Sequence, residues 1–213
     1  MQFNRHYQLE GKHAMLSASS WRWLNDDMDS LTNRLRSQYA TEIGTVLHNV
    51  ACEHIKYRIK MNKYDKKNVM LRLLASGIPG FIVDSIDLDS IFENLMAYVN
   101  DGVGFKMQPE VVLYYSDNFF GTTDTIHYSE KDRFLRIHDY KSGTTPAHME
   151  QLLIYAALFC LEYRMKPTEF DSELRIYQNN NVVFHNPAPE EIAIISDKII
   201  TFDNHLRKMK EEV

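Results

Sequence analysis

The chain has 213 residues, 44% of them apolar and 25% charged, which is ordinary for a soluble globular protein with a sizeable core. Its net charge of -5 does not indicate a general nucleic-acid binder, although a local cluster of cations can still bind phosphates. The two cysteines, Cys52 and Cys160, lack CxxC spacing, which argues against a disulfide scaffold, a zinc ribbon or a four-cysteine iron–sulfur cluster. No signal peptide or long uncharged apolar run is visible, so we expect a cytoplasmic protein without a membrane partner.

The N-terminal residues 1–15 are polar and predict a loosely held arm. A serine-rich stretch follows just before an apolar run that begins at Trp21, and it contains Ser17, Ser19 and Ser20. Serines in this position are candidate helix N-caps. Exposed hydroxyls near helix amides also suit a phosphate, so both interpretations stay open.

A helix is predicted from Thr41 to about Lys60, with an apolar stripe that runs from Ile43 to Ala51. His48 lies at the edge of this stripe, and its neighbours one turn away, Gly44 and Cys52, are small. Small neighbours leave room for another group to approach the imidazole. A histidine here is either a packed, hydrogen-bonded residue or a metal ligand.

Residues 56–72 concentrate positive charge, with Asp65 as their one acid. Such a segment either neutralises phosphates or is a solvated helix end and loop. Residues 61–104 predict a helical insertion within a single domain, interrupted by a break at Gly77–Gly80. The cations of the basic segment are Lys56, Arg58, Lys60, Lys63, Lys66, Lys67 and Arg72.

Residues 109–115 predict a first strand, with Glu110 at its start as either a further acid of a site or a strand-end charge. Residues 121–143 then predict a hairpin with a polar turn centred between Lys131 and Asp132. This turn places Asp124 opposite Asp139, where opposed Cβ atoms lie roughly 4.5–5.5 Å apart.

Two opposed carboxylates repel each other unless a cation bridges them. Lys141 shares a strand face with Asp139, because side chains alternate along a strand. The pattern therefore favours a divalent-metal site with a cationic helper. The alternative is a hairpin whose acids and lysine are ordinary solvated charges.

A buried helix is predicted from about Ala147 to Arg164, and it carries one polar stripe. Polar side chains on a buried helix need hydrogen-bond partners. Either the stripe faces the predicted metal site and a substrate, or its residues form a structural hydrogen-bond pair. A last hairpin surrounds residues 179–181, and a C-terminal helix is predicted within 186–213. The polar stripe consists of His148, Gln151 and Tyr155.

These motifs together resemble the RecB-type branch of the PD-(D/E)XK nuclease superfamily. The matching residues are Leu16-Ser-x-Ser-Ser, Gly44-Thr-x-x-His48, Gly121-x-x-Asp124, Ile137-His-Asp-Tyr-Lys-Ser-Gly143 and Gln151-x-x-x-Tyr155. Each motif alone is weak, but their order and spacing over residues 16–165 are specific. The resemblance implies an α/β fold with a restriction-endonuclease-like core, in which helices flank a mixed central sheet.

The resemblance also implies roles for individual residues. It implies Mg²⁺ or Mn²⁺ held by His48, Asp124, Asp139 and the backbone carbonyl of Tyr140. Lys141 would be the catalytic lysine. Gln151 and Tyr155 would act in catalysis and substrate binding, and no iron–sulfur cluster is expected. We further expect substrate contacts from Ser17, Ser19, Ser20, Lys56, Arg58 and Lys60.

The function that follows from the resemblance is a metal-dependent DNA exonuclease of recombination, repair or phage DNA processing. In a phage-encoded protein the setting would be the host cytoplasm. A helicase or a single-strand annealing protein is a possible partner, since the chain lacks a GxxxxGK[ST] motor motif. Two alternatives remain, a DNA endonuclease of the same fold and a catalytically silent subunit that binds DNA or a protein.

Overall fold

The computed structural model describes residues 3–143 and 145–211. The chain forms two compact units, residues 1–42 and 43–213. The first unit holds two short 3-10 segments, η1 (Tyr7–Leu9) and η2 (Ala18–Asn25), and the beginning of helix α1 (Met28–Lys56). The described residues leave out residues 1–2, 144 and 212–213. Parts of the predicted N-terminal arm, of the turn before residue 147 and of the C-terminal segment therefore lie outside them.

Helix α1 begins earlier than the sequence predicts, at Met28 instead of Thr41, and it ends at Lys56. Its first turn is closed by Asp27, whose carboxylate accepts a 2.8 Å hydrogen bond from the Ser30 amide. The first turns bury no side chain, so they carry no apolar stripe that periodicity could detect. The predicted serine cap is wrong for Ser17, which makes no side-chain cap bond.

The second unit is built on an open sheet of five strands in the order β1-β2-β3-β4-β5. Strands β3 and β4 are parallel and the other neighbours are antiparallel, so the sheet is mixed, as predicted. The strands are β1 (Gln108–Ser116), β2 (Phe119–Ser129), β3 (Phe134–Tyr140), β4 (Asp171–Gln178) and β5 (Asn181–His185).

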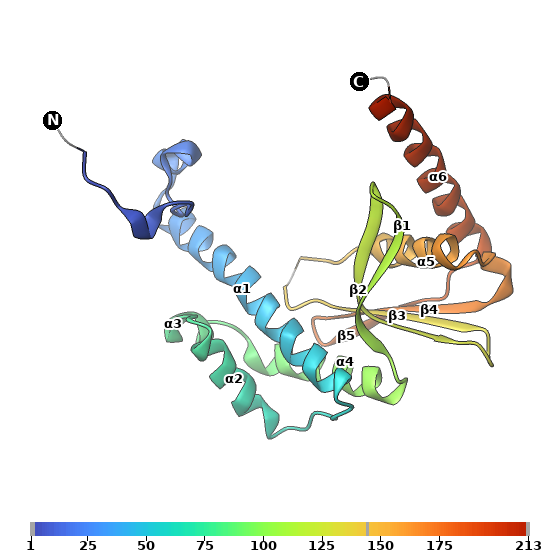
Figure 1. Cartoon of the computed structure of the whole chain (residues 1–213). Helices are drawn as coiled ribbons and strands as arrows, with labels where there is room; N and C mark the ends of the chain where they lie inside the picture. Colours follow the sequence, from blue (N-terminus) through green and yellow to red (C-terminus); the bar gives the residue numbers. More distant parts are fainter. Residues whose placement is uncertain (1–2, 144, 212–213) are drawn as a thin grey trace. The chain divides into compact units, whose positions relative to one another are not determined.

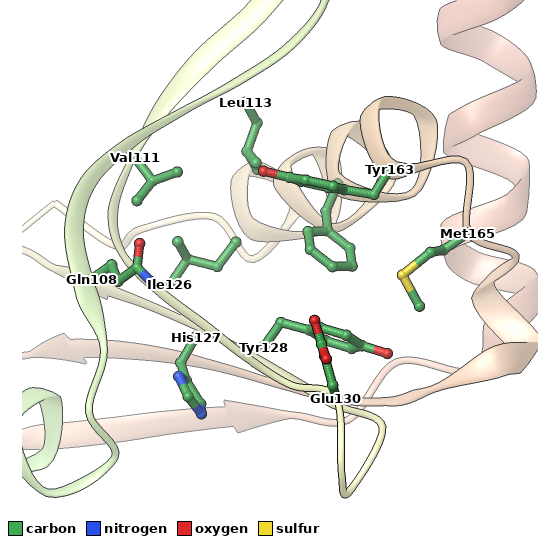
Figure 2. A pocket seen from close by; sticks show the side chains of 10 residues that line it. Gln108, Val111, Leu113, Ile126, His127, Tyr128, Glu130, Tyr163 and Met165 are labelled. Atoms are coloured by element: carbon green, nitrogen blue, oxygen red, sulfur yellow. The ribbon is translucent and has the colours of Figure 1, made fainter.

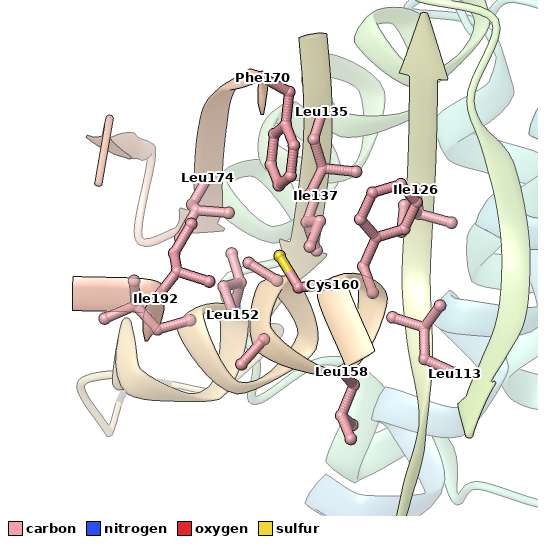
Figure 3. Packing of buried hydrophobic residues seen from close by; sticks show 14 of the residues in the cluster. Leu113, Ile126, Leu135, Ile137, Leu152, Leu158, Cys160, Phe170, Leu174 and Ile192 are labelled. Atoms are coloured by element: carbon pink, nitrogen blue, oxygen red, sulfur yellow. The ribbon is translucent and has the colours of Figure 1, made fainter. Parts of the chain in front are cut away.

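Helix α5 (Glu150–Tyr163) covers one face of the sheet, and α6 (Pro189–Glu211) packs against α5 (Figure 1). Figure 3 shows the core that they share with the strands, in which Leu135, Ile137 and Leu174 pack around Cys160. A short 3-10 turn, η3 (Pro167–Glu169), connects α5 to β4.

Helix α4 (Leu88–Gly104) covers the opposite face. Its Tyr98 stacks on Tyr140 at a centroid distance of 5.6 Å and meets Tyr177 edge-on at 5.3 Å. Helices α2 (Asp65–Ala75) and α3 (Gly80–Val83) precede it, so the segment predicted as a helical insertion is helical. The coarse prediction of an α/β fold with helices flanking a mixed sheet is therefore confirmed.

The register of β2 against β3 is the predicted one, since Ile126 pairs with Ile137 and Thr125 with His138. Asp124 consequently lies opposite Asp139, one step further along the two strands. Helix α5 begins at Glu150, three residues later than predicted. The cause is Gln178, whose side chain bonds the backbone of Thr145 and Ala147 and holds this segment out of the helix.

Candidate metal centre

Two carboxylates and an ammonium group meet at the end of β3, beside the middle of β2: Asp139 is buried, Asp124 is partly buried, and the ammonium is that of Lys141. Lys141 Nζ lies 2.9 Å from Asp139 Oδ1 and 2.8 Å from Oδ2. Asp124 Oδ2 accepts a 2.9 Å hydrogen bond from the Tyr140 amide. The Lys141 amide donates to the Tyr177 carbonyl at 3.0 Å, which fixes the backbone of the lysine beside the acids.

His48 reaches this centre from α1. Its Nδ1 lies 3.5 Å from Asp124 Oδ2, and its ring meets Tyr140 edge-on at 5.5 Å. A hydrogen bond also joins the ring to the backbone of Tyr140. An added Cβ on Gly44, one turn earlier, would lie 3.4 Å from Ser142 Oγ, so α1 passes close to the end of β3. The structure thus brings together His48, Asp124, Asp139 and Lys141.

The surroundings of the two acids disfavour their negatively charged forms. Burial, together with the charge of Asp124, raises the pKa of Asp139 to about 6 despite the neighbouring Lys141. Burial also raises the pKa of Asp124, although the Tyr140 amide and Lys141 oppose the shift. The two carboxyl groups lie within hydrogen-bonding reach of each other, so they can share a proton.

The imidazole of His48 is held in its neutral form. Burial lowers the pKa of His48, and the carboxylate of Asp139 only partly offsets this effect. A neutral imidazole has a free ring nitrogen lone pair, which is the state in which histidine binds a metal.

Glu110 belongs to the surroundings of this centre. Its charge acts to raise the pKa of both Asp124 and His48, and its side chain hydrogen-bonds the Cys52 thiol. Burial, reinforced by that bond, raises the pKa of Cys52 to about 11. Glu110 adopts a left-handed backbone with φ of 54°, a conformation that is costly for a residue other than glycine. No local sequence signal predicts such a conformation for a glutamate.

A chain of contacts leads from the acids to α5. Lys141 Nζ lies 3.4 Å from Gln151 Oε1, and Gln151 Nε2 lies 3.4 Å from Tyr155 Oη. The Tyr155 hydroxyl donates a 2.7 Å hydrogen bond to the carbonyl of Thr122 on β2. A Cβ on Gly121 would lie 2.9 Å from Tyr155 Cε1, so only glycine lets this ring pack against the strand. Tyr155 therefore fixes β2 two residues before Asp124.

The donor set suits Mg²⁺ or Mn²⁺, because both take carboxylate oxygens and Mn²⁺ also accepts imidazole. Asp139 Oδ2 is buried and accepts no hydrogen bond of good geometry within residues 3–143 and 145–211, although Lys141 lies beside it. The same part of the chain contains no three His, Cys, Asp or Glu side chains already arranged around one ion. Asp124, Asp139 and His48 are donors of the types that these ions accept, and a metal on Asp139 would have to replace Lys141 as its charge partner.

The remaining predicted residues are spread over both units. Ser17 and Ser19 join their hydroxyls at 3.0 Å within the N-terminal unit, which also holds Ser20, and substrate contacts from these serines stay a prediction. The Arg58 guanidinium donates to the backbone carbonyls of Met107 and Lys106 at 2.8 and 3.3 Å, which gives it a structural role. Lys56 and Lys60 are exposed.

The expected polar stripe of α5 reaches the centre only in part. Gln151 and Tyr155 are in contact with it, as described above. His148 precedes the helix, and its side chain is 85% exposed beside Glu150.

A separate cavity of about 430 Å³ lies beside the other end of α5 (Figure 2). Val111, Leu113 and Ile126 line its apolar side, and Tyr163 and Glu130 its polar side. None of the four converging residues lines it, so it is not part of the metal centre.

Comparison with known families places residues 13–164 in a family described as "Protein of unknown function (DUF2800)". The chain belongs to this family. Searches of curated proteins and of solved structures found no match. The DUF2800 match spans all four converging residues, and its description assigns them no role. No helix in the described parts of the chain is long and apolar enough to cross a membrane.

Proposed function

We propose that this DUF2800 protein is a metal-dependent DNA nuclease that acts as an exonuclease, with a restriction-endonuclease-like core. The observation that supports the proposal is the convergence of Asp124, Asp139, Lys141 and His48, which come from three elements of the fold. An acid pair with one fully buried member is costly to keep, and acids with raised pKa values cluster at functional sites. The sequence resemblance to RecB-type nucleases gives the same residues the same roles.

His48, Asp124, Asp139 and the Tyr140 carbonyl would hold Mg²⁺ or Mn²⁺. When bound, the ion would lower the pKa of a water and neutralise charge on the phosphate. The chain's own contribution is then positional. Lys141 leaves Asp139 and places its ammonium against the negative charge that develops on the phosphate. Gln151 holds that ammonium from the side of α5.

The proposal is tested by incubating the purified chain with end-labelled linear DNA and with covalently closed circular DNA, in Mn²⁺, in Mg²⁺ and in EDTA. We expect metal-dependent release of nucleotides from linear DNA and no cutting of circles. Asp139→Asn and Lys141→Met should lose this activity by orders of magnitude, with DNA binding largely retained.

The outcomes separate the alternatives. Cutting of circular DNA at comparable rates would favour an endonuclease of the same fold. Absence of cleavage on every substrate, with DNA still bound, would favour a catalytically silent subunit. Equal digestion by the wild type and by Asp139→Asn would overturn the assignment of the site.

A further inference from the structure

The segment from the last residue of α1 to the first turn of α2 carries exposed aromatic and basic side chains in alternation. We refer to residues 56–67 as the basic–aromatic loop. Tyr57 is 68% exposed and Tyr64 is 77% exposed, so both side chains are largely accessible to solvent. Ile59 between them is 56% exposed. Exposed tyrosines of this kind gain nothing from the protein core, so burial does not account for them.

The backbone of the loop is firmly anchored. Helix α1 ends in a Schellman arrangement, in which the Ile59 amide bonds the His54 carbonyl at 2.9 Å and the Arg58 amide bonds Ile55 at 3.2 Å. Arg58 takes the left-handed position usually held by glycine, with φ of 59°. Its two bonds to the backbone of residues 106 and 107 hold it there.

A second anchor lies three residues later. Met61 is buried, and its amide and carbonyl bond the Asn100 side chain at 2.8 and 3.0 Å. The carboxylate of Asp65 accepts from the Asn62 amide at 2.8 Å. The loop is therefore pre-organised, and its tyrosines project from a fixed frame.

The loop also has more cations than local acids can neutralise. Lys66 pairs with Asp89, and Lys63 lies over the Tyr64 ring at 5.2 Å. Lys56, Lys60 and Lys67 are exposed, and within the described residues they form no ion pair. A surface of this composition is complementary to a polyanion that carries flat apolar groups.

Single-stranded DNA has this chemistry, since its phosphates are accompanied by bases whose faces are unpaired and available for stacking. A duplex offers the same phosphates but keeps its base faces inside the stack. Lys56, the last residue of α1, follows His48 by eight residues, which is about 12 Å along the helix axis, and Tyr57 is the next residue. A strand bound on the loop is thus within a few nucleotides of the candidate metal centre.

We propose that the basic–aromatic loop is a binding platform for single-stranded DNA. Bases stack on Tyr57 and Tyr64, while the lysines of the loop contact phosphates. This inference rests on the proposed nuclease function and names the form of DNA that the enzyme holds.

The test is fluorescence anisotropy with a labelled 20-nucleotide oligothymidine and with a blunt duplex of equal length, in EDTA, so that cleavage does not contribute. Tyr57→Ala and Tyr64→Ala should each weaken binding to the single strand by roughly 5- to 150-fold, with little effect on the duplex. Tyr57→Phe and Tyr64→Phe keep the ring and should bind like the wild type. The Tyr163→Ala control removes a tyrosine that is 54% exposed on α5 and should leave binding unchanged.

Salt dependence tests the lysines separately. Each phosphate contact on a single strand contributes about 0.7 to the slope of log affinity against log salt. A double change of Lys60→Gln and Lys63→Gln should therefore reduce the slope by about 1.4. Circular dichroism of every variant checks that the fold is intact.

Two results would overturn the inference, namely equal affinity for the single strand and the duplex, or tyrosine-to-alanine variants that bind the single strand like the wild type. Failure of the nuclease proposal is read separately, from cleavage assays with Mn²⁺. If cleavage is intact but binding to the single strand does not depend on the tyrosines, only the proposed binding platform is refuted. Absence of cleavage with tyrosine-dependent binding intact removes only the nuclease assignment.

Discussion

Replacing Asp139 by asparagine should stabilise the metal-free protein while abolishing its activity. The Asp139 side chain is 3% exposed and lies opposite Asp124, so at neutral pH the fold carries a buried, repulsive charge. A folded pKa of about 6 against about 3.9 in the unfolded chain corresponds to a cost of about 3 kcal/mol above pH 6. Asparagine removes the charge and loses the Lys141 contact, so a net gain of about 1–3 kcal/mol is expected.

The sign of the pH dependence is fixed by linkage. Because the folded pKa of Asp139 is raised, the folded state binds more protons than the unfolded state between about pH 4 and pH 6. The penalty is therefore absent near pH 4, grows as pH rises through this window, and is complete above pH 6. The advantage of Asp139→Asn should follow the same curve and vanish near pH 4.

The assay is urea denaturation in EDTA at pH 7.5 and at pH 4, followed by far-ultraviolet circular dichroism. Tryptophan fluorescence is unsuitable, because both tryptophans, Trp21 and Trp23, lie in the N-terminal unit. The control is Asp171→Asn, an exposed aspartate at the start of β4 that should change stability by less than about 0.5 kcal/mol. An Asp139→Asn protein that is less stable than the wild type at pH 7.5 would refute the reasoning.

Three further predictions concern the surroundings of the site. Gly121→Ala places a methyl group 2.9 Å from the Tyr155 ring and should cost about 1–3 kcal/mol in urea denaturation; in a Tyr155→Ala background most of that cost should disappear, and strict additivity would contradict the contact. Tyr155→Phe loses the bond to the Thr122 carbonyl and should lower stability by about 1 kcal/mol and slow cleavage, whereas unchanged values would argue against a positioning role. His138 is fully buried, and burial holds its pKa well below the ordinary value. As pH falls below about 6.5, this histidine is protonated in the unfolded state but not in the folded state, so the stability of the fold decreases. His138→Gln should reduce this slope by up to about 1.4 kcal/mol per pH unit, and the exposed control His148→Gln should leave it unchanged.

The sequence predicts those parts of the structure that depend on short-range patterns. The alternation along 121–143 and its polar turn give the correct register, and with it the opposition of Asp124 and Asp139. The spacing of Gln151 and Tyr155 predicts one helical stripe, and in the structure Gln151 contacts both Lys141 and Tyr155.

Other features depend on contacts between distant segments, and local patterns do not report them. The left-handed conformation of Glu110 places a further acid beside the site, and nothing in its neighbours predicts it. The need for glycine at position 121 comes from a ring 34 residues away in sequence, that of Tyr155. Likewise, α5 begins at Glu150 because Gln178 bonds the backbone before it, and Gln178 lies on β4, which follows α5 in the sequence.

The most direct test of the central claim is the time course of nucleotide release from end-labelled linear DNA in Mn²⁺, with wild type and Asp139→Asn prepared in parallel. Digestion that requires Mn²⁺ in the wild type and is absent in the variant is the predicted result. Digestion that persists in EDTA, or that is equally fast in the variant, would contradict the assignment of Asp139 and its neighbours as the metal centre.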